Sequence, residues 1–177
     1  ALLDELETDT KRVDWLIAQS TGLFGLDELL SGGIRPGLNL ICAKPGAGKT
    51  ALALQIADFI AAQGQDVLWI SLDMTREELL SRSLARLTLQ QDKTIHKKKA
   101  CSIQDILQSF SEKASKAIIQ QSLQVYRQTM QTFYCHEVIS APDLNDIEQL
   151  ISRHMTLTGH KPVVVIDSLQ SIRFAEG

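Results

Sequence analysis

The chain has 177 residues, and 44% of them are hydrophobic, a balance typical of one globular domain with a sizeable core. Its 18 basic and 21 acidic side chains give a net charge of -3, which excludes a globally basic nucleic-acid-binding protein. Any DNA-binding surface must therefore be local or form by assembly. No apolar run approaches the ~20 residues of a membrane span, and no signal-peptide pattern is recognisable, so we expect a cytoplasmic protein without a membrane partner.

Residues 1–19 are expected to form a lead-in or linker helix, because Leu2, Leu3 and Leu6 share one helical face. These leucines either dock on a neighbouring subunit or fill the chain's own core, and the sequence leaves both readings open. A cluster of turn residues at 31–37 follows, just before the most informative stretch. We expect the domain proper to cover residues 20–177.

The central stretch predicts a strand, a loop and a helix in succession. Leu38 to Cys42 is a short apolar segment that predicts a strand, and apolar residues from Leu52 to Ile60 recur at helical spacing. The loop between them matches the phosphate-binding pattern G-x-x-x-x-G-K-[ST], except that alanine holds the first position. The expected cofactor contacts come from Ala43, Lys44, Pro45, Gly46, Ala47, Gly48, Lys49, Thr50 and Ala51.

This loop predicts a site for a nucleoside triphosphate, with ATP as the expected cofactor. Backbone N–H groups at the start of the helix and the positive end of its dipole attract an anion. Lys49 is expected to reach the β- and γ-phosphates as a catalytic residue, and the Thr50 hydroxyl to take one position on Mg²⁺. A chance match is the alternative, but the strand-then-helix context favours the phosphate loop.

The rest of the chain predicts strands that alternate with helices, as in a parallel α/β sheet. Thr75 and Glu78 have the form of a capping box, which marks a helix start. Residues 89–133 are polar and helix-favouring, so we expect a helical insertion there, with Ser102 as an N-cap. The expected strands cover residues 67–72, 134–139 and 162–167, and a last helix is expected from Pro142-Asp143 to Gly159.

One concentrated basic patch lies inside this helical segment. It consists of His96, Lys97, Lys98 and Lys99. A solvated loop is favoured over a nucleic-acid contact here, because runs of like charge are usually exposed surface, but both readings stay open.

Two aspartates follow apolar strands and complete the predicted site. In open α/β sheets, ligands gather at the carboxyl ends of the strands, so Asp73 and Asp167 should both face the nucleotide. Asp167 is expected to hold the magnesium shell beside the γ-phosphate. Asp73 is expected to activate the attacking water as a catalytic base, with a helix cap or an outer contact as the alternative.

Together these residues resemble the RecA-like motor domain of DnaB-type replicative DNA helicases. The resemblance rests on the loop at 43–50, on Ser71-Leu72-Asp73-Met74 and on Ile166-Asp167-Ser168-Leu169-Gln170, and it extends to the Thr21-Gly22 and Leu26-Asp27 pairs. It implies an α/β fold with a mainly parallel sheet flanked by helices. It also implies ATP- and Mg²⁺-dependent movement along single-stranded DNA, a homo-hexameric ring and replication proteins as partners.

Three features depart from that family. Asp73 stands where the family has glutamate, and a side chain shorter by about 1.5 Å must reach the water differently, which can cost about a hundredfold in rate. The segment 89–133 is longer than usual. The sequence also stops at Gly177, before the family's sensor strand, DNA loops and in-trans arginine. The resemblance therefore implies a fragment with a gap in the middle of the sheet, between the phosphate-loop strand and the strand that ends at Asp167.

Two alternatives remain at this level. A recombination or repair ATPase like RadA or KaiC has a similar Ile-Asp-Ser-Leu-Gln end, although the long helical segment argues against it. A nucleotide-binding regulator, loader or ring member with little hydrolysis is the other, and Asp73 is the residue that keeps it open.

Overall fold

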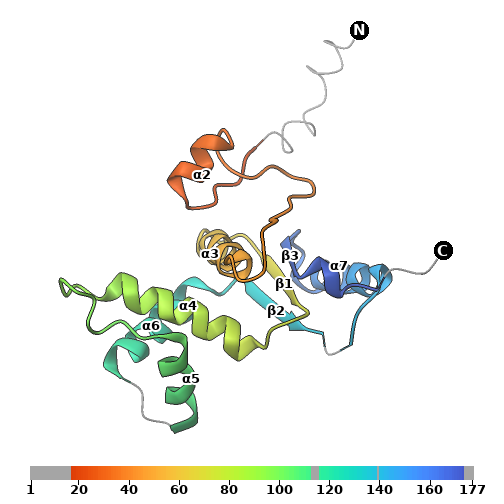
Figure 1. The fold of residues 1–177 in the computed structure, drawn as a ribbon. Helices are drawn as coiled ribbons and strands as arrows, with labels where there is room; N and C mark the ends of the chain where they lie inside the picture. Colours follow the sequence, from red (N-terminus) through yellow and green to blue (C-terminus); the bar gives the residue numbers. More distant parts are fainter. Residues whose placement is uncertain (1–16, 113–115, 139, 174–177) are drawn as a thin grey trace. The chain divides into compact units, whose positions relative to one another are not determined.

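The computed structural model describes residues 17–112, 116–138 and 140–173 (Figure 1). The chain divides into two compact units, Ala1–Lys49 and Thr50–Gly177. The expected lead-in helix falls mainly on residues 1–16, which lie outside the described part. Among the described helices, none combines the length and the apolar character that crossing a membrane requires.

The first unit is organised around Asp27, on the short helix α2 (Phe24–Leu29). One carboxylate oxygen accepts a hydrogen bond from the Ser20 hydroxyl at 2.6 Å, and the other accepts one from the Thr21 N–H at 2.8 Å. The Thr21 hydroxyl donates to the same carboxylate. These bonds lower the pKa of Asp27, the one from Ser20 most of all. Because the N-cap of α2 has no side-chain hydrogen bond, Asp27 is the residue that fixes the chain before it.

A two-residue bridge closes this unit. The N–H of Gln19 donates to the carbonyl of Ile34 at 2.7 Å, and the reverse bond is 2.9 Å long. Gly33, beside the bridge, has a φ of +129°, and a Cβ at this position would lie 2.1 Å from the Gln19 carbonyl oxygen. Only glycine fits there.

The predicted strand from Leu38 to Cys42 is wrong. This segment has no regular secondary structure, and its apolar side chains are exposed, with Leu38 at 88% and Leu40 at 63%. A strand persists only when a neighbour satisfies its backbone groups, and no described strand pairs with this segment. Its apolar composition was therefore not enough to make it a strand.

The second unit contains a three-stranded parallel sheet in the order β2-β1-β3. The strands are β1 (Val67–Ser71), β2 (Phe133–Glu137) and β3 (Val163–Asp167), all close to their predicted positions. Every residue of β1 is buried, as expected for a central strand covered on both faces. Within the described sheet β3 is an edge strand.

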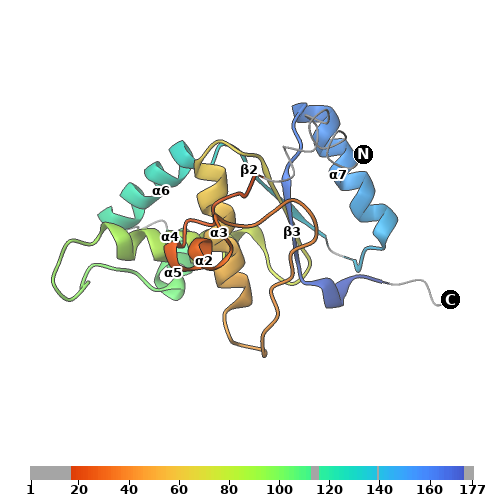
Figure 2. The ribbon, with the colours of Figure 1, turned by 90° about the horizontal axis from the view of Figure 1, so that it is seen from above.

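Helices cover both faces of this sheet (Figure 2). Helix α7 (Leu144–Thr158) lies on one face, where Ile147 packs with Leu68 and Ile70 of β1. Helices α3 (Lys49–Ala62) and α4 (Arg76–Gln91) lie on the opposite side (Figures 1 and 2). The chain is therefore an α/β layer structure, as predicted.

The segment 89–133 contains the end of α4 and two further helices, α5 (Ile103–Glu112) and α6 (Ala117–Thr129). Both pack on α4 through a separate apolar cluster composed of Leu84, Cys101, Ile106 and Ile119. The predicted N-cap is confirmed, because the N–H of Asp105 donates to the Ser102 hydroxyl at 3.2 Å. The capping box at Thr75 and the helix end at Gly159, which has a φ of 75°, are also confirmed.

Candidate functional site

The predicted phosphate loop lies in the first unit as an exposed turn that runs into α3 at Lys49. The N–H of Ala47 donates to the carbonyl of Lys44 at 3.2 Å, which closes the turn. Gly48 has a φ of +94°, a conformation that other residues rarely adopt. The Lys49 ammonium donates to the carbonyls of Ala43 and Lys44, at 3.2 and 3.5 Å. Within the part of the chain that the structure describes, the ammonium group donates to these loop carbonyls alone, so an anion can replace those contacts.

The second unit brings both predicted aspartates to the carboxyl edge of the sheet. Asp167 is the last residue of β3 and pairs with Ser71, the last residue of β1. Asp73 lies two residues after Ser71 along the chain. The N–H of Leu72 donates to the Asp167 carbonyl at 2.8 Å, which holds the two strand ends together. The expectation that Asp73 and Asp167 lie at the same edge of the parallel sheet is confirmed.

Both oxygens of the Asp73 carboxylate are occupied by serine hydroxyls. Ser168 donates to one oxygen at 2.7 Å, and Ser171 donates to the other at 2.8 Å. We call this arrangement the serine clasp; it joins the end of β1 to the short 3-10 helix η3 (Leu169–Ser171). Because both carboxylate oxygens are engaged, the role of a catalytic base requires one of these hydrogen bonds to open.

Asp167 has a different environment. Its Oδ2 atom is buried and has no hydrogen-bond partner among the described residues. A buried carboxylate oxygen without a partner is costly unless a cation or donor completes it. No described group of three or more His, Cys, Asp or Glu side chains could hold a metal by itself. The free oxygen of Asp167 fits Mg²⁺, which binds through one or two protein oxygens together with substrate phosphates and water.

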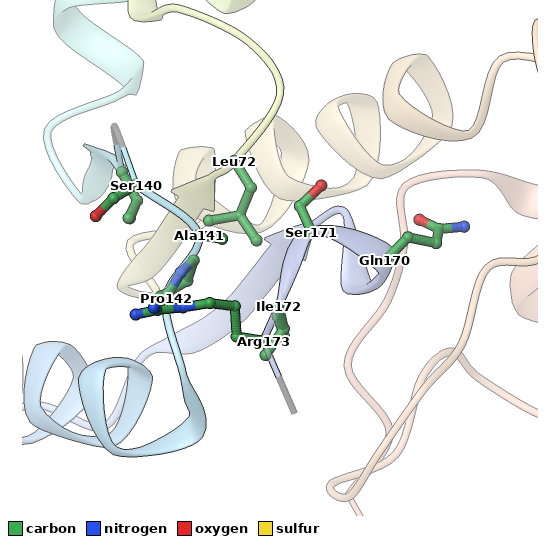
Figure 3. Close-up of a pocket in the computed structure, with 9 residues that line it drawn as sticks. Leu72, Ser140, Ala141, Pro142, Gln170, Ser171, Ile172 and Arg173 are labelled. Carbon is green, nitrogen blue, oxygen red and sulfur yellow. The ribbon is translucent and has the colours of Figure 1, made fainter. Parts of the chain in front are cut away.

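A shallow cavity of about 290 Å³ adjoins the serine clasp. Figure 3 shows Leu72, Pro142 and Ile172 around it, while the side chains of Ser140 and Gln170 point away. The N–H of Arg173 donates to the Pro142 carbonyl at 2.8 Å, which joins the chain after η3 to the loop before α7. Both apolar and polar residues line this cavity, among them Leu72 and Ile172 on one hand and Ser171 and Arg173 on the other.

Glu137, at the end of β2, is a further acidic residue at this edge. Its carboxylate accepts a hydrogen bond from the Arg76 N–H at 2.6 Å and lies 3.4 Å from the Arg76 Nε. It therefore anchors the start of α4 beside Asp73 and is already neutralised.

Sequence reasoning missed the two serines of the clasp. The signal was present: Ser168 and Ser171 are three residues apart, directly after the strand that ends at Asp167, a spacing that puts two hydroxyls on one side of a single helical turn. Their common partner, Asp73, is 95 and 98 residues away along the chain and could not be inferred from local pattern.

Comparison with known protein families identifies the architecture. Residues 19–176 match the family described as DnaB-like helicase C terminal domain. The chain belongs to this family. The predicted resemblance to DnaB-type helicases and the RecA-like α/β fold are thereby confirmed.

Individual relatives include replicative helicases and a DNA repair protein. The chain is 35% identical over 82 residues to the replicative DNA helicase DnaB of Geobacillus stearothermophilus, a match that covers 46% of this chain and 18% of the relative. It is 40% identical over 65 residues to DnaB of Nostoc sp., covering 36% and 7%. The DNA repair protein RadA of Campylobacter jejuni is 32% identical over 117 residues, covering 66% and 24%. The aligned segments thus cover less than a quarter of the length of each of these relatives.

Proposed function

We propose that this chain is part of an ATP-driven DNA helicase motor that moves along single-stranded DNA within a homo-hexameric ring. The match of residues 19–176 to the helicase family carries this proposal. It covers the loop at 43–50 as well as Asp73 and Asp167, the residues that the chemistry needs. Replication proteins are the expected partners, because the matched relatives include replicative helicases.

We infer that the loop and the strand ends hold one nucleotide. Lys49 would exchange its two carbonyl contacts for β- and γ-phosphate oxygens, which it binds as a point charge. Thr50 and Asp167 would hold Mg²⁺, which supplies charge neutralisation at the phosphates when bound. The partnerless Oδ2 of Asp167 supports this role.

Asp73 would orient the attacking water and take its proton. To do so, one of its carboxylate oxygens must exchange a serine hydrogen bond for the water. The remaining serine then keeps the carboxylate in place, so the clasp can position the base without blocking it. The rest of the α4 start is fixed independently by Glu137, which accepts from the N–H of Arg76.

Two variants separate a base from a structural clasp. Asp73→Asn should lower ATP hydrolysis by about a hundredfold or more, because it removes the proton acceptor, while ATP binding is retained. The double variant Ser168→Ala/Ser171→Ala removes both hydrogen bonds of the serine clasp but keeps the Asp73 carboxylate. Phosphate release and ATP affinity are measured for both. If both variants lose hydrolysis to the same extent, Asp73 acts only through the clasp, and the base assignment is wrong.

Phosphate release with and without single-stranded DNA tests the motor itself. Stimulation by single-stranded DNA supports the helicase proposal. Tight ATP binding without release, with or without DNA, contradicts it and favours a nucleotide-binding regulator or loader. The shorter side chain of Asp73 and its engagement by two serines are the observations behind that second candidate.

A further inference from the structure

A basic loop joins α4 to α5, from Asp92 to Cys101. It carries four lysines and one histidine between residues 93 and 99, all of them exposed. Among the described residues, no carboxylate forms an ion pair with any of these five side chains. In a chain of net charge -3, this leaves one compact patch of uncompensated positive charge.

The conformation of the basic loop is fixed by one buried carboxylate. One oxygen of Asp92 accepts hydrogen bonds from the N–H and the hydroxyl of Thr94, at 2.8 and 2.7 Å. The other accepts from the N–H groups of Lys99 and Ala100, at 2.7 and 3.0 Å. Burial opposes ionisation of Asp92, but these bonds outweigh it and lower its pKa to about 2.

This arrangement uses the charge of Asp92 for the backbone rather than for the lysines. The Lys97 ammonium donates to the Asp92 carbonyl, and the N–H of Lys98 donates to the Thr94 hydroxyl at 3.0 Å. Lys97 has a φ of +50°, a strained conformation that persists only when its surroundings fix it. The loop therefore presents its lysines from an ordered backbone, and a polyanion that binds them orders only the side chains.

The basic loop lies away from the strand ends that carry Asp73 and Asp167. It follows the last residue of α4, whereas the first residue of α4 lies at the carboxyl edge of the sheet, where the Arg76 N–H contacts Glu137. Sixteen helical residues span about 24 Å. A ligand on the loop is therefore distinct from one bound at those strand ends.

We propose that the basic loop binds the phosphate backbone of single-stranded nucleic acid. Closely spaced lysine ammonium groups suit successive phosphates, which they bind as point charges without reading sequence. Ile95, 93% exposed, is the only apolar side chain among residues 93–99, so the loop offers little area to a folded protein partner. The choice of nucleic acid over another polyanion rests on the proposed function.

The salt dependence of binding tests this proposal. We would compare the full chain with Lys98→Gln/Lys99→Gln and with Arg127→Gln/Lys161→Gln, a control that removes the same charge from two exposed positions elsewhere. Affinity for a fluorescent oligothymidylate is measured by anisotropy over a salt series. For single strands, each lost phosphate contact lowers the slope of log K against log salt by about 0.7, so the loop variant should lose about 1.4. At low salt it should bind roughly tenfold more weakly than the control.

Each outcome decides the matter. Equal affinity and slope for the two variants would overturn the proposal. So would a loop variant that loses binding to an oligoglutamate of matched charge but keeps binding to the oligothymidylate, since the loop would then be a site for acidic protein. ATP affinity, measured on the same samples, reports on the nucleotide site separately. If the chain does not bind ATP, the proposed function is contradicted, but the comparison of oligothymidylate binding between the two variants remains valid.

Discussion

Replacing Lys49 by alanine should weaken ATP binding by about a hundredfold or more. A charge-assisted hydrogen bond is worth about 1.5–3 kcal/mol, and loss of about 2.7 kcal/mol corresponds to a hundredfold in affinity. Among residues 17–112, 116–138 and 140–173, the Lys49 ammonium donates only to the exposed loop carbonyls of Ala43 and Lys44, so its removal leaves no buried group there without a partner. The variant should therefore fold normally. Isothermal titration with ATP and Mg²⁺ measures the loss directly.

Lys44 provides the matched control for this variant. It lies in the same exposed loop and carries the same charge, but it does not hold the position that the motif reserves for phosphate binding. Lys44→Ala should weaken ATP binding only slightly. Equal losses in the two variants would mean that the loop attracts ATP through its overall charge. Unchanged affinity in Lys49→Ala would remove the nucleotide site altogether.

The elements of the second unit could be predicted because their signals are local. The capping box of Thr75 and Glu78, the N-cap Ser102 and the αL glycine Gly159 each act within one helical turn. The buried strand β1 was recognisable from its continuous run of strand-favouring residues. Such features need no knowledge of distant neighbours.

The errors and omissions arose from contacts between distant residues. Leu38 to Cys42 has the composition of a strand, but a strand also needs a partner, and none of the described strands pairs with it. Asp73 was found at the expected edge, yet its engagement by Ser168 and Ser171 depends on how β1 and β3 align. Position along the sequence therefore identified the candidate residues, whereas their hydrogen-bond partners came only from the structure.

Asp58, on α3, is another residue that periodicity alone did not reveal. It lies on the buried face of the helix with an exposed fraction of 2%, among apolar neighbours. Its Oδ2 atom accepts hydrogen bonds from the Ser83 hydroxyl at 2.6 Å and from the Arg86 guanidinium, both on α4. Burial raises the pKa of Asp58, although Arg86 and Ser83 act in the opposite direction. The Asp58 carboxylate therefore joins α3 to α4 through these hydrogen bonds.

Arg86→Met should lower the free energy of unfolding by about 3 kcal/mol at neutral pH, because it leaves a buried carboxylate without its cation. Removing Arg86 also removes the main influence that lowers the pKa of Asp58, so that pKa rises further above its value in the unfolded chain. A carboxyl group with a raised pKa in the folded state costs stability as pH rises through that pKa. The variant should therefore be less destabilised at about pH 5 than at about pH 8. Urea unfolding at the two pH values measures the difference.

A double variant distinguishes the buried charge from a simple loss of packing. In Asp58→Leu/Arg86→Met both charged groups are replaced by apolar ones, and such replacements are often neutral or stabilising. Most of the stability lost in Arg86→Met should therefore return, and its dependence on pH between these values should disappear. If the double variant is as unstable as Arg86→Met at both pH values, the arginine stabilises the α3 to α4 contact through its aliphatic part, and the charge of Asp58 is not the cause.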